Sequence, residues 1–312
     1  MMTDEKTFLD NYRIEDYERP SIAADIVTFA IMRVAEEENF RKNRGKDLKV
    51  LLIKRGTHPF INKWALPGGF VKPGESVLET ARRELLEETN ISNAAFSVMD
   101  ICSDADRDPR GWIISNSYMA LVNGDECELR ADTDAWEAAW FTVKLSVIHS
   151  DSILEAKGAD DSGSFVKKTE NKYLLELYRD SRSEQNNVCT TEPLSLEDEL
   201  TETIVFDGNH MSLDIVLNTE SELAFDHAKI ILKSILKLRE KIEKDVITAF
   251  DFLPERFTLS ELQNVIEQIM DKKLLTANFR RSINDYVIET DEYFEGEGHR
   301  PAKLYRRNPA KF

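Results

Sequence analysis

The sequence predicts an α/β domain followed by a smaller helical domain that ends in a β-hairpin. Runs rich in β-branched and aromatic residues, beginning with 23–35 and 48–54, indicate strands in the first half of the chain. A glycine-rich loop then leads into one amphipathic helix. From residue 222 the pattern changes to helices, and the last two are separated by a short turn and followed by hairpin-like segments.

The composition limits the class of protein. A chain of 312 residues with 41% hydrophobic content is long enough for two folded domains. The formal charge of −17 opposes nonspecific attraction to nucleic acid. We expect no membrane span and no secretory signal, because no apolar run is long enough. The three cysteines, Cys102, Cys127 and Cys189, have no metal-ligand spacing, so we expect inert thiols in a cytoplasmic protein.

The first elements lead to the glycine-rich loop. Residues 1–20 predict a loose N-terminal arm, and 36–47 a charged loop between the two strands. The connection 55–66 brings Trp64 close to the loop. Trp64 either faces a ligand site or packs as a core aromatic.

The loop and its helix carry the strongest signal. Gly68-Gly69 and Pro73-Gly74 predict a tightly turning backbone that is open to a ligand. Ser76 can cap a helix that runs to about Thr89. An apolar stripe of Leu78, Ala81 and Leu85 would pack this helix against the sheet.

Three carboxylates share another face of the same helix. Glu84, Glu87 and Glu88 stand at i, i+3 and i+4, where like charges repel. One interpretation is a solvated acidic surface. The other is a site for a hard divalent cation, Mg²⁺ or Mn²⁺, because such ions prefer oxygen ligands and bridge to phosphates.

This stretch resembles the Nudix box. The matching pattern is Gly69, five residues, Glu75, seven residues, then Arg83-Glu84-Leu85-x-Glu87-Glu88-x-x-Ile91. Asn90 departs from the family's glycine, but asparagine is the next best residue for a left-handed helix end. The resemblance implies an α/β/α sandwich with a mixed sheet and metal binding by Gly69, Glu84, Glu87 and Glu88. It also implies that Glu75 supports the site and that Arg83 orients the acidic cluster.

A charged turn follows the helix. Strands are predicted at 96–103, 112–122 and 138–143, with the turn at 104–111. The turn resembles the Arg-Asp-Pro-Arg-Gly segment of Nudix proteins that act on ADP-ribose. Arg107 and Arg110 would either bind pyrophosphate oxygens or staple the turn through local Arg–Asp pairs.

Residues 144–221 form an insertion after this predicted Nudix domain of residues 21–143. We expect it to be partly mobile, with polar stretches at 151–164 and 179–200. Strand-like segments at 202–206 and 212–217 flank Asp207-Gly208 and predict a hairpin. The insertion would extend the sheet or a dimer surface.

The remainder, 222–312, has a winged-helix pattern. A long amphipathic helix at 224–244 is followed by a helix opening at the capping box of Thr258 and Glu261. Thr276 can cap a second helix over 277–286, and 287–289 with 302–306 would form a wing.

The winged helix is a candidate DNA-binding domain. It contains 16 basic and 16 acidic residues, so the rest of the chain carries the excess negative charge. Contacts to phosphates and bases would come from Asn278, Arg280, Arg281 and Arg300. The alternative is a winged helix that serves only dimer contacts.

Three segments, Ala224-Phe225-Asp226-His227, Asn278-Phe279-Arg280-Arg281 and Gly296 to Tyr305, resemble those of Nudix-related transcriptional regulators. The similarity covers residues 20–143 and 222–307. The resemblance implies a Mg²⁺-dependent hydrolase of ADP-ribose or a related nucleoside diphosphate. The alternative is a regulator of NAD or sugar metabolism that senses such a molecule and releases palindromic operator DNA. A homodimer would suit either function.

Overall fold

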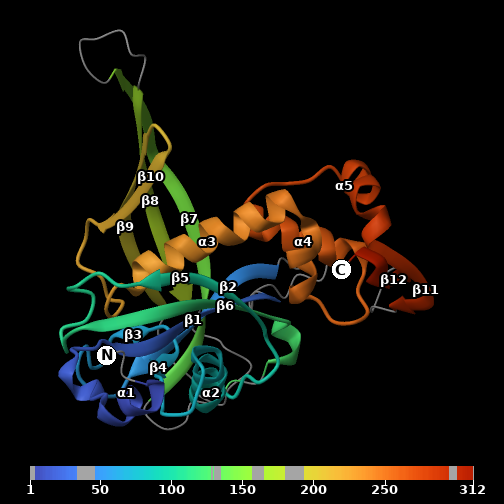
Figure 1. Cartoon of the computed structure of the whole chain (residues 1–312). Helices are drawn as coiled ribbons and strands as arrows, with labels where there is room; N and C mark the ends of the chain where they lie inside the picture. The colour runs from blue at the N-terminus through green and yellow to red at the C-terminus, as the bar shows by residue number, and fades with distance from the viewer. Residues whose placement is uncertain are drawn as a thin grey trace.

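One large mixed sheet organises the molecule, in a computed structural model that describes residues 4–33, 46–127, 129, 135–156, 165–179, 193–294 and 301–311. Its strands follow the order β10-β9-β8-β7-β2-β1-β6-β5, and β3 and β4 pair with β2 and β1 (Figure 1). The bounds of these strands are β1 Ser21–Arg33, β2 Lys46–Arg55, β3 Trp64–Ala65, β4 Gly68–Phe70, β5 Ala95–Cys102, β6 Ile113–Val122, β7 Ala135–Ala156, β8 Phe165–Arg179, β9 Leu194–Asp207 and β10 His210–Leu217.

Strand β1 lies at the centre of the sheet, parallel to β6 and antiparallel to β2. Its alternating side chains build two cores, because successive residues of a strand point to opposite faces. Ile26 and Ala30 pack with Leu85 of helix α2 (Val77–Thr89). Val27 and Phe29 share the other core with helix α3 (His227–Lys244). The predicted α/β/α sandwich with a mixed sheet is therefore confirmed.

Helix α2 has the ends that its sequence predicts. The Ser76 side chain accepts a hydrogen bond from the N–H of Glu79, and the Glu79 carboxylate accepts one from the N–H of Ser76. At the other end Asn90 adopts a left-handed conformation with φ 64°. These two caps fix where the acidic face of α2 begins and ends.

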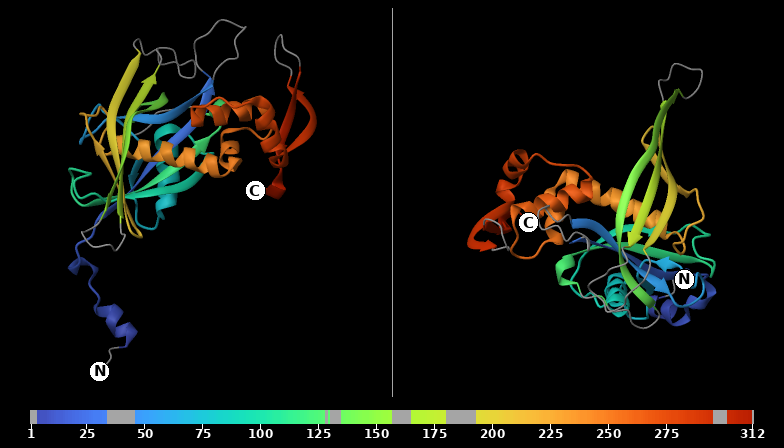
Figure 2. Two further views of the ribbon diagram at one scale, coloured as in Figure 1. Left: turned by 90° about the horizontal axis from the view of Figure 1, so that it is seen from above. Right: turned by 180° about the vertical axis from the view of Figure 1, so that it is seen from behind.

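The predicted boundary at residue 143 falls inside a strand. Strand β7 is continuous over 22 residues and pairs with β8, which pairs with β9. The β9–β10 hairpin forms at the predicted Asp-Gly turn, with Gly208 at φ +59°. Residues 144–156, 165–179 and 194–217 thus extend the main sheet as a projecting blade (Figure 2).

The C-terminal part is a winged helix joined to the sheet by α3 (Figure 1). Helix α4 (Leu259–Met270) opens with the predicted Thr258–Glu261 capping box. Helix α5 (Thr276–Ile283) begins one residue earlier than predicted, and Leu275 rather than Thr276 is its N-cap. Strands β11 (Val287–Phe294) and β12 (Ala302–Arg307) form the wing.

The N-terminal arm stands apart from the sheet. Helix α1 (Glu5–Asn11) buries none of its residues and extends away from the rest of the chain (Figure 2). Within the described residues, no helix has both the length and the apolar character that crossing a membrane requires.

Candidate functional site

The glycine-rich loop lies directly on β1 and α2. Strand β4 pairs with residues 23–25 of β1. A Cβ atom on Gly68 would lie 2.3 Å from the carbonyl oxygen of Ala24, and one on Gly69 would lie 2.3 Å from Oε1 of Glu84. A side chain at position 68 would collide with the backbone of β1, and one at position 69 would displace the Glu84 carboxylate, so the backbone of the loop lies against the first carboxylate of the acidic face.

The acidic face of α2 turns toward this loop. Glu88 is 8% exposed, and its Oε2 accepts the N–H of Gly68 at 2.9 Å. The Glu84 side chain is 14% exposed, whereas that of Glu87 is 42% exposed. Glu84 is therefore partly buried and Glu88 largely buried beside the loop, whereas Glu87 lies at its solvent-exposed edge.

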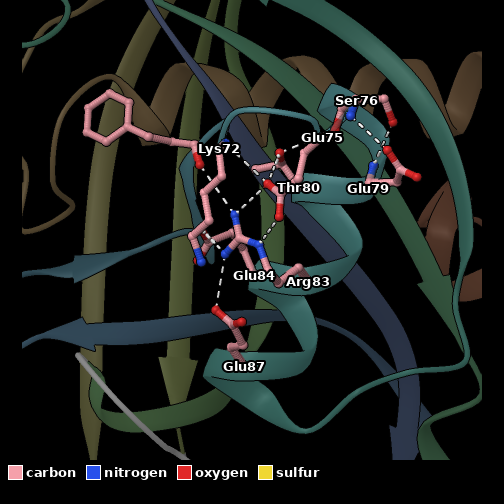
Figure 3. Close-up of polar contacts among 9 residues, drawn as sticks. Lys72, Glu75, Ser76, Glu79, Thr80, Arg83, Glu84 and Glu87 are labelled. Atoms are coloured by element: carbon pink, nitrogen blue, oxygen red, sulfur yellow. Dashed lines mark hydrogen bonds and ion pairs between the residues drawn. The ribbon is translucent and has the colours of Figure 1, made fainter.

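Arg83 connects the acidic groups to one another (Figure 3). Its Nε and one terminal nitrogen donate to the two oxygens of Glu75 at 2.7 and 3.0 Å. Its other terminal nitrogen donates to Glu84 at 2.6 Å and to Glu87 at 3.1 Å. The expected orienting role of Arg83 and the supporting role of Glu75 fit this arrangement.

These contacts set the charge of the site. The hydrogen bond from Arg83 lowers the pKa of Glu75 to about 2, with further bonds from the Thr80 hydroxyl and the Lys72 N–H. Glu75 in turn raises the pKa of Arg83. Both groups are ionised at neutral pH, so Arg83 offsets part of the repulsion within the cluster.

The residues fit a hard divalent cation by their chemistry. Three carboxylates and the backbone of Gly69 supply only oxygen donors, which Mg²⁺ and Mn²⁺ prefer. Among the described residues, no three acidic, histidine or cysteine side chains converge closely enough to form a metal-ligand group. A cation at this site would compete with Arg83 for Glu84 and Glu87.

Arg107, one of the two arginines expected to bind a diphosphate, is buried and already paired with carboxylates. It is 8% exposed, and its guanidinium donates to both oxygens of Asp226 at 3.0 and 2.8 Å and to Asp25 at 3.0 Å. Its Nε and one terminal nitrogen are thus bound by carboxylates from β1 and from the start of α3. In this structure Arg107 joins the sheet to α3.

Arg110 is the exposed member of the pair. It donates bidentately to Asp108 at 3.0 and 2.7 Å, as in the alternative of a turn stapled by local pairs. Its side chain is still 41% exposed. The guanidinium lies over the rings of Phe70 and Phe225, so Arg110 lies beside the glycine-rich loop.

Trp64 belongs to the core. It is 4% exposed and packs edge-on against Phe141, with the ring centroids 4.8 Å apart. Of the two interpretations of Trp64, the structure supports core packing, and the expected substrate contact is corrected.

The candidate DNA-binding residues lie mostly on one helix. Asn278, Arg280 and Arg281 are exposed on α5. Neither arginine has an ion pair within the part of the chain that the structure describes. Arg300 falls outside the described residues.

Sequence reasoning missed Arg55 and Phe225, which lie with Arg110 in one cluster. Phe225 belongs to the Ala224-Phe225-Asp226-His227 segment, which carried the resemblance to regulators. That resemblance could have identified Phe225 as a candidate site residue. No sequence motif around Arg55 marks it as one.

Comparison with known proteins agrees with this architecture. A family profile described as the NUDIX domain matches residues 40–161, and the chain therefore contains a Nudix domain. A second profile, the NrtR DNA-binding winged helix domain, matches residues 249–307. The chain thus joins a Nudix domain to an NrtR-type winged helix.

Relatives match either the whole chain or the Nudix part. The ADPR responsive transcriptional repressor NtrR of Acinetobacter baylyi is 26% identical over 97% of this chain and 88% of that protein. The ADP-ribose pyrophosphatase of Methanocaldococcus jannaschii is 48% identical over 31% of this chain and 57% of that protein.

Solved structures share the fold over nearly the full length. A MutT/nudix family protein from Enterococcus faecalis has a TM-score of 0.61 and 27% identity, covering 97% of this chain and 92% of that one. Shewanella oneidensis NrtR has a TM-score of 0.53 and 23% identity, covering 92% and 94%.

Proposed function

We propose that the chain is a Mg²⁺-dependent Nudix hydrolase that cleaves the pyrophosphate of ADP-ribose or a related nucleoside diphosphate. The observation that carries the proposal is the complete acidic set on α2, in which Arg83 binds Glu84 and Glu87 and Glu88 accepts the N–H of Gly68. The similarity to an ADP-ribose pyrophosphatase supports the choice of substrate.

The residues divide into distinct roles. Glu84, Glu87 and Glu88, with the backbone of Gly69, would hold Mg²⁺ or Mn²⁺. When bound, such an ion neutralises phosphate charge and polarises the attacking water. Glu75 holds Arg83 in place through a two-point ion pair, and Arg83 aligns Glu84 and Glu87. Arg110 is the exposed guanidinium for a diphosphate, because Arg107 is buried whereas the Arg110 side chain is 41% exposed.

Glu87→Gln tests hydrolysis, because it removes one anionic ligand while keeping the shape of the side chain. We expect Mg²⁺-dependent ADP-ribose turnover to fall by about 100-fold, as when a charge-stabilising group is lost from an active site. Glu197→Gln, an exposed change on β9, should leave turnover unchanged. Equal rates in wild type and Glu87→Gln, or no turnover in either, would contradict the proposal.

A second function, DNA binding released by an ADP-ribose-like effector, is favoured by α5. Arg280 and Arg281 are exposed there, where a winged helix presents its recognition helix. The similarity to an ADPR responsive repressor supports the choice of effector. A cytoplasmic homodimer on a palindromic site completes this proposal.

Replacing Arg280 and Arg281 with alanine tests DNA binding. With a duplex from upstream of the protein's own coding sequence, we expect weaker binding and a salt slope reduced by about one unit per lost phosphate contact. Fluorescence anisotropy over a salt series measures both. Arg256→Ala, which removes an arginine outside α5, is the control. Unchanged affinity in the double variant would rule out this function for α5.

A further inference from the structure

A cluster of arginine and aromatic side chains lies beside the glycine-rich loop. The guanidinium carbon of Arg110 is 4.9 Å from the ring centroid of Phe70 and 5.4 Å from that of Phe225. The guanidinium carbon of Arg55 is 5.0 Å from the centroid of Phe225. The Phe225 ring therefore contacts two guanidinium groups, and Phe60 packs edge-on against it at 4.8 Å.

The two arginines leave hydrogen-bonding capacity for an anion. Arg55 donates from Nε to the carbonyl oxygen of Pro59 at 2.8 Å, and within the described residues its terminal nitrogens have no acceptor. Burial lowers the pKa of Arg55, and the positive charge of Arg110 lowers it further. A bound anion would relieve this repulsion and supply the missing acceptors.

The cluster is continuous with the acidic site. Phe70 follows Gly69, and its carbonyl oxygen accepts a hydrogen bond from Arg83 at 3.3 Å. One end of a nucleotide diphosphate can therefore lie at the α2 carboxylates while its other end reaches the Phe225 ring. Aromatic rings and guanidinium planes both offer flat surfaces on which a base stacks.

Phe225 is also attached firmly to α3. Its φ of 55° lies in the left-handed region, which a bulky residue adopts only when its surroundings hold it there. The next two residues are fixed: Asp226 by Arg107, and His227 by the N–H of Leu66, which donates to Nδ1 at 2.9 Å. At its far end α3 contacts the winged helix through Arg239, which donates to the carbonyl oxygen of Ile269 at 2.9 Å.

We propose that Arg55, Arg110 and Phe225 form a second half of the nucleotide site, which binds an anionic group and a planar group. Phe225 transmits the occupancy of this half to α3 and thereby to the winged helix. This inference rests on the proposed function, since it assumes a nucleoside diphosphate in the Nudix site. It assigns ligand contact to Arg55 and Phe225, which no part of the proposed function uses, and gives the segment 224–227 that leads into α3 a part in regulation.

Calorimetric titrations test the ligand contacts. ADP-ribose and inorganic pyrophosphate would be titrated, in EDTA to prevent turnover, into wild type, Arg55→Gln, Phe225→Leu, Phe225→Tyr and Phe206→Leu. We expect Arg55→Gln to weaken both ligands by about tenfold, through loss of charge-assisted hydrogen bonds. Phe225→Leu should weaken ADP-ribose by about tenfold and pyrophosphate far less. Phe225→Tyr keeps the ring and should bind as wild type, and so should Phe206→Leu, a control on the blade.

Hydrogen exchange over residues 226–244, with and without saturating ADP-ribose, tests the transmission. Wild type and Arg55→Gln should both show altered protection at saturation, whereas Phe225→Leu should show none. If the wild-type protein binds ADP-ribose but both Phe225→Leu and Arg55→Gln match it in affinity and exchange, this inference alone is overturned. If the wild-type protein hydrolyses ADP-ribose with Mg²⁺ but does not bind it in EDTA, this inference alone is overturned. If it neither binds nor hydrolyses ADP-ribose, the proposed function fails and the inference fails with it.

Discussion

Asp25 is a buried carboxylate that joins the glycine-rich loop to α3. It lies on β1 opposite Gly68, and it accepts a hydrogen bond from Arg107 at 3.0 Å. Its other oxygen is 3.7 Å from Nε2 of His227. Because Nδ1 of His227 accepts the N–H of Leu66, the imidazole proton lies on Nε2, facing Asp25.

The charge of Asp25 should make stability depend on pH. Burial alone would raise its pKa, but the Nε2–H of His227 that faces it and the charge of Arg107 outweigh burial and hold the pKa below its usual range. The unfolded pKa is about 3.9, so the stabilisation is complete above that value and is lost as pH falls toward the folded pKa. We therefore expect Asp25→Asn to destabilise the protein more at about pH 7 than at about pH 3.

Urea denaturation of both proteins across this range measures the difference. Asp10→Asn, which changes an exposed carboxylate on α1, controls for the change in net charge. A stability difference for Asp25→Asn that stays constant with pH would contradict the assignment.

For single residues, the sequence predicts the contacts that depend on local spacing along the chain. Glu84 and Glu88 share a helical face because i and i+4 positions do so in any α-helix. Arg107 was interpreted from the charges of its own turn, but its partner Asp226 is 119 positions away. The burial of Trp64 likewise depends on Phe141 of β7. Contacts between distant segments have no signal in the spacing of one stretch.

Among the secondary-structure elements, α2 depends on its left-handed end. Asn90 has φ 64°, a conformation that costs most residues about 1 kcal/mol but costs glycine little. We therefore expect Asn90→Ala to lower the free energy of unfolding by about 1 kcal/mol, and Asn90→Gly to leave it unchanged or slightly raised. Chemical denaturation measures both.

Asn93→Ala, in the exposed loop after α2, is the matched control and should have little effect. If Asn90→Ala and Asn93→Ala gave the same stability, the conformation of Asn90 would not limit the helix.

The caps of α2 and α4 were predictable because capping chemistry involves residues only three positions apart. The length of β7 was not. Its outer part contains Ser150, Asp151 and Ser152, which predict a loop when the segment is considered alone. Backbone pairing with β8, for example Ser150 opposite Asn171, keeps this part extended.

Over the whole molecule, one hydrophobic core joins the sheet to the winged helix. The same buried cluster contains Phe29 of β1, Leu175 of β8, Ile235 of α3 and Leu262 of α4. Segments that share a continuous core lose their packing together. We therefore expect one cooperative thermal transition for the Nudix sheet and the winged helix.

Differential scanning calorimetry of wild type and Leu262→Ala tests this expectation. Removing a fully buried leucine costs about 3 kcal/mol, so the whole transition should move to lower temperature. Leu213→Ala, at a position that is 44% exposed on β10, should move it much less. Two resolved transitions, with only one of them shifted by Leu262→Ala, would show that the two parts unfold independently.

The unbroken course of β7 restricts how this protein can be divided. A break after Val143 would separate β8 from nearly all of its partner strand and remove the buried Leu145 from the Nudix part. The part that kept β8 would then have an open strand edge with unpaired amide and carbonyl groups, which readily recruits other chains into aggregates. An isolated Nudix part, whether expressed alone, fused or exchanged, therefore has to keep the blade together with the rest of the sheet.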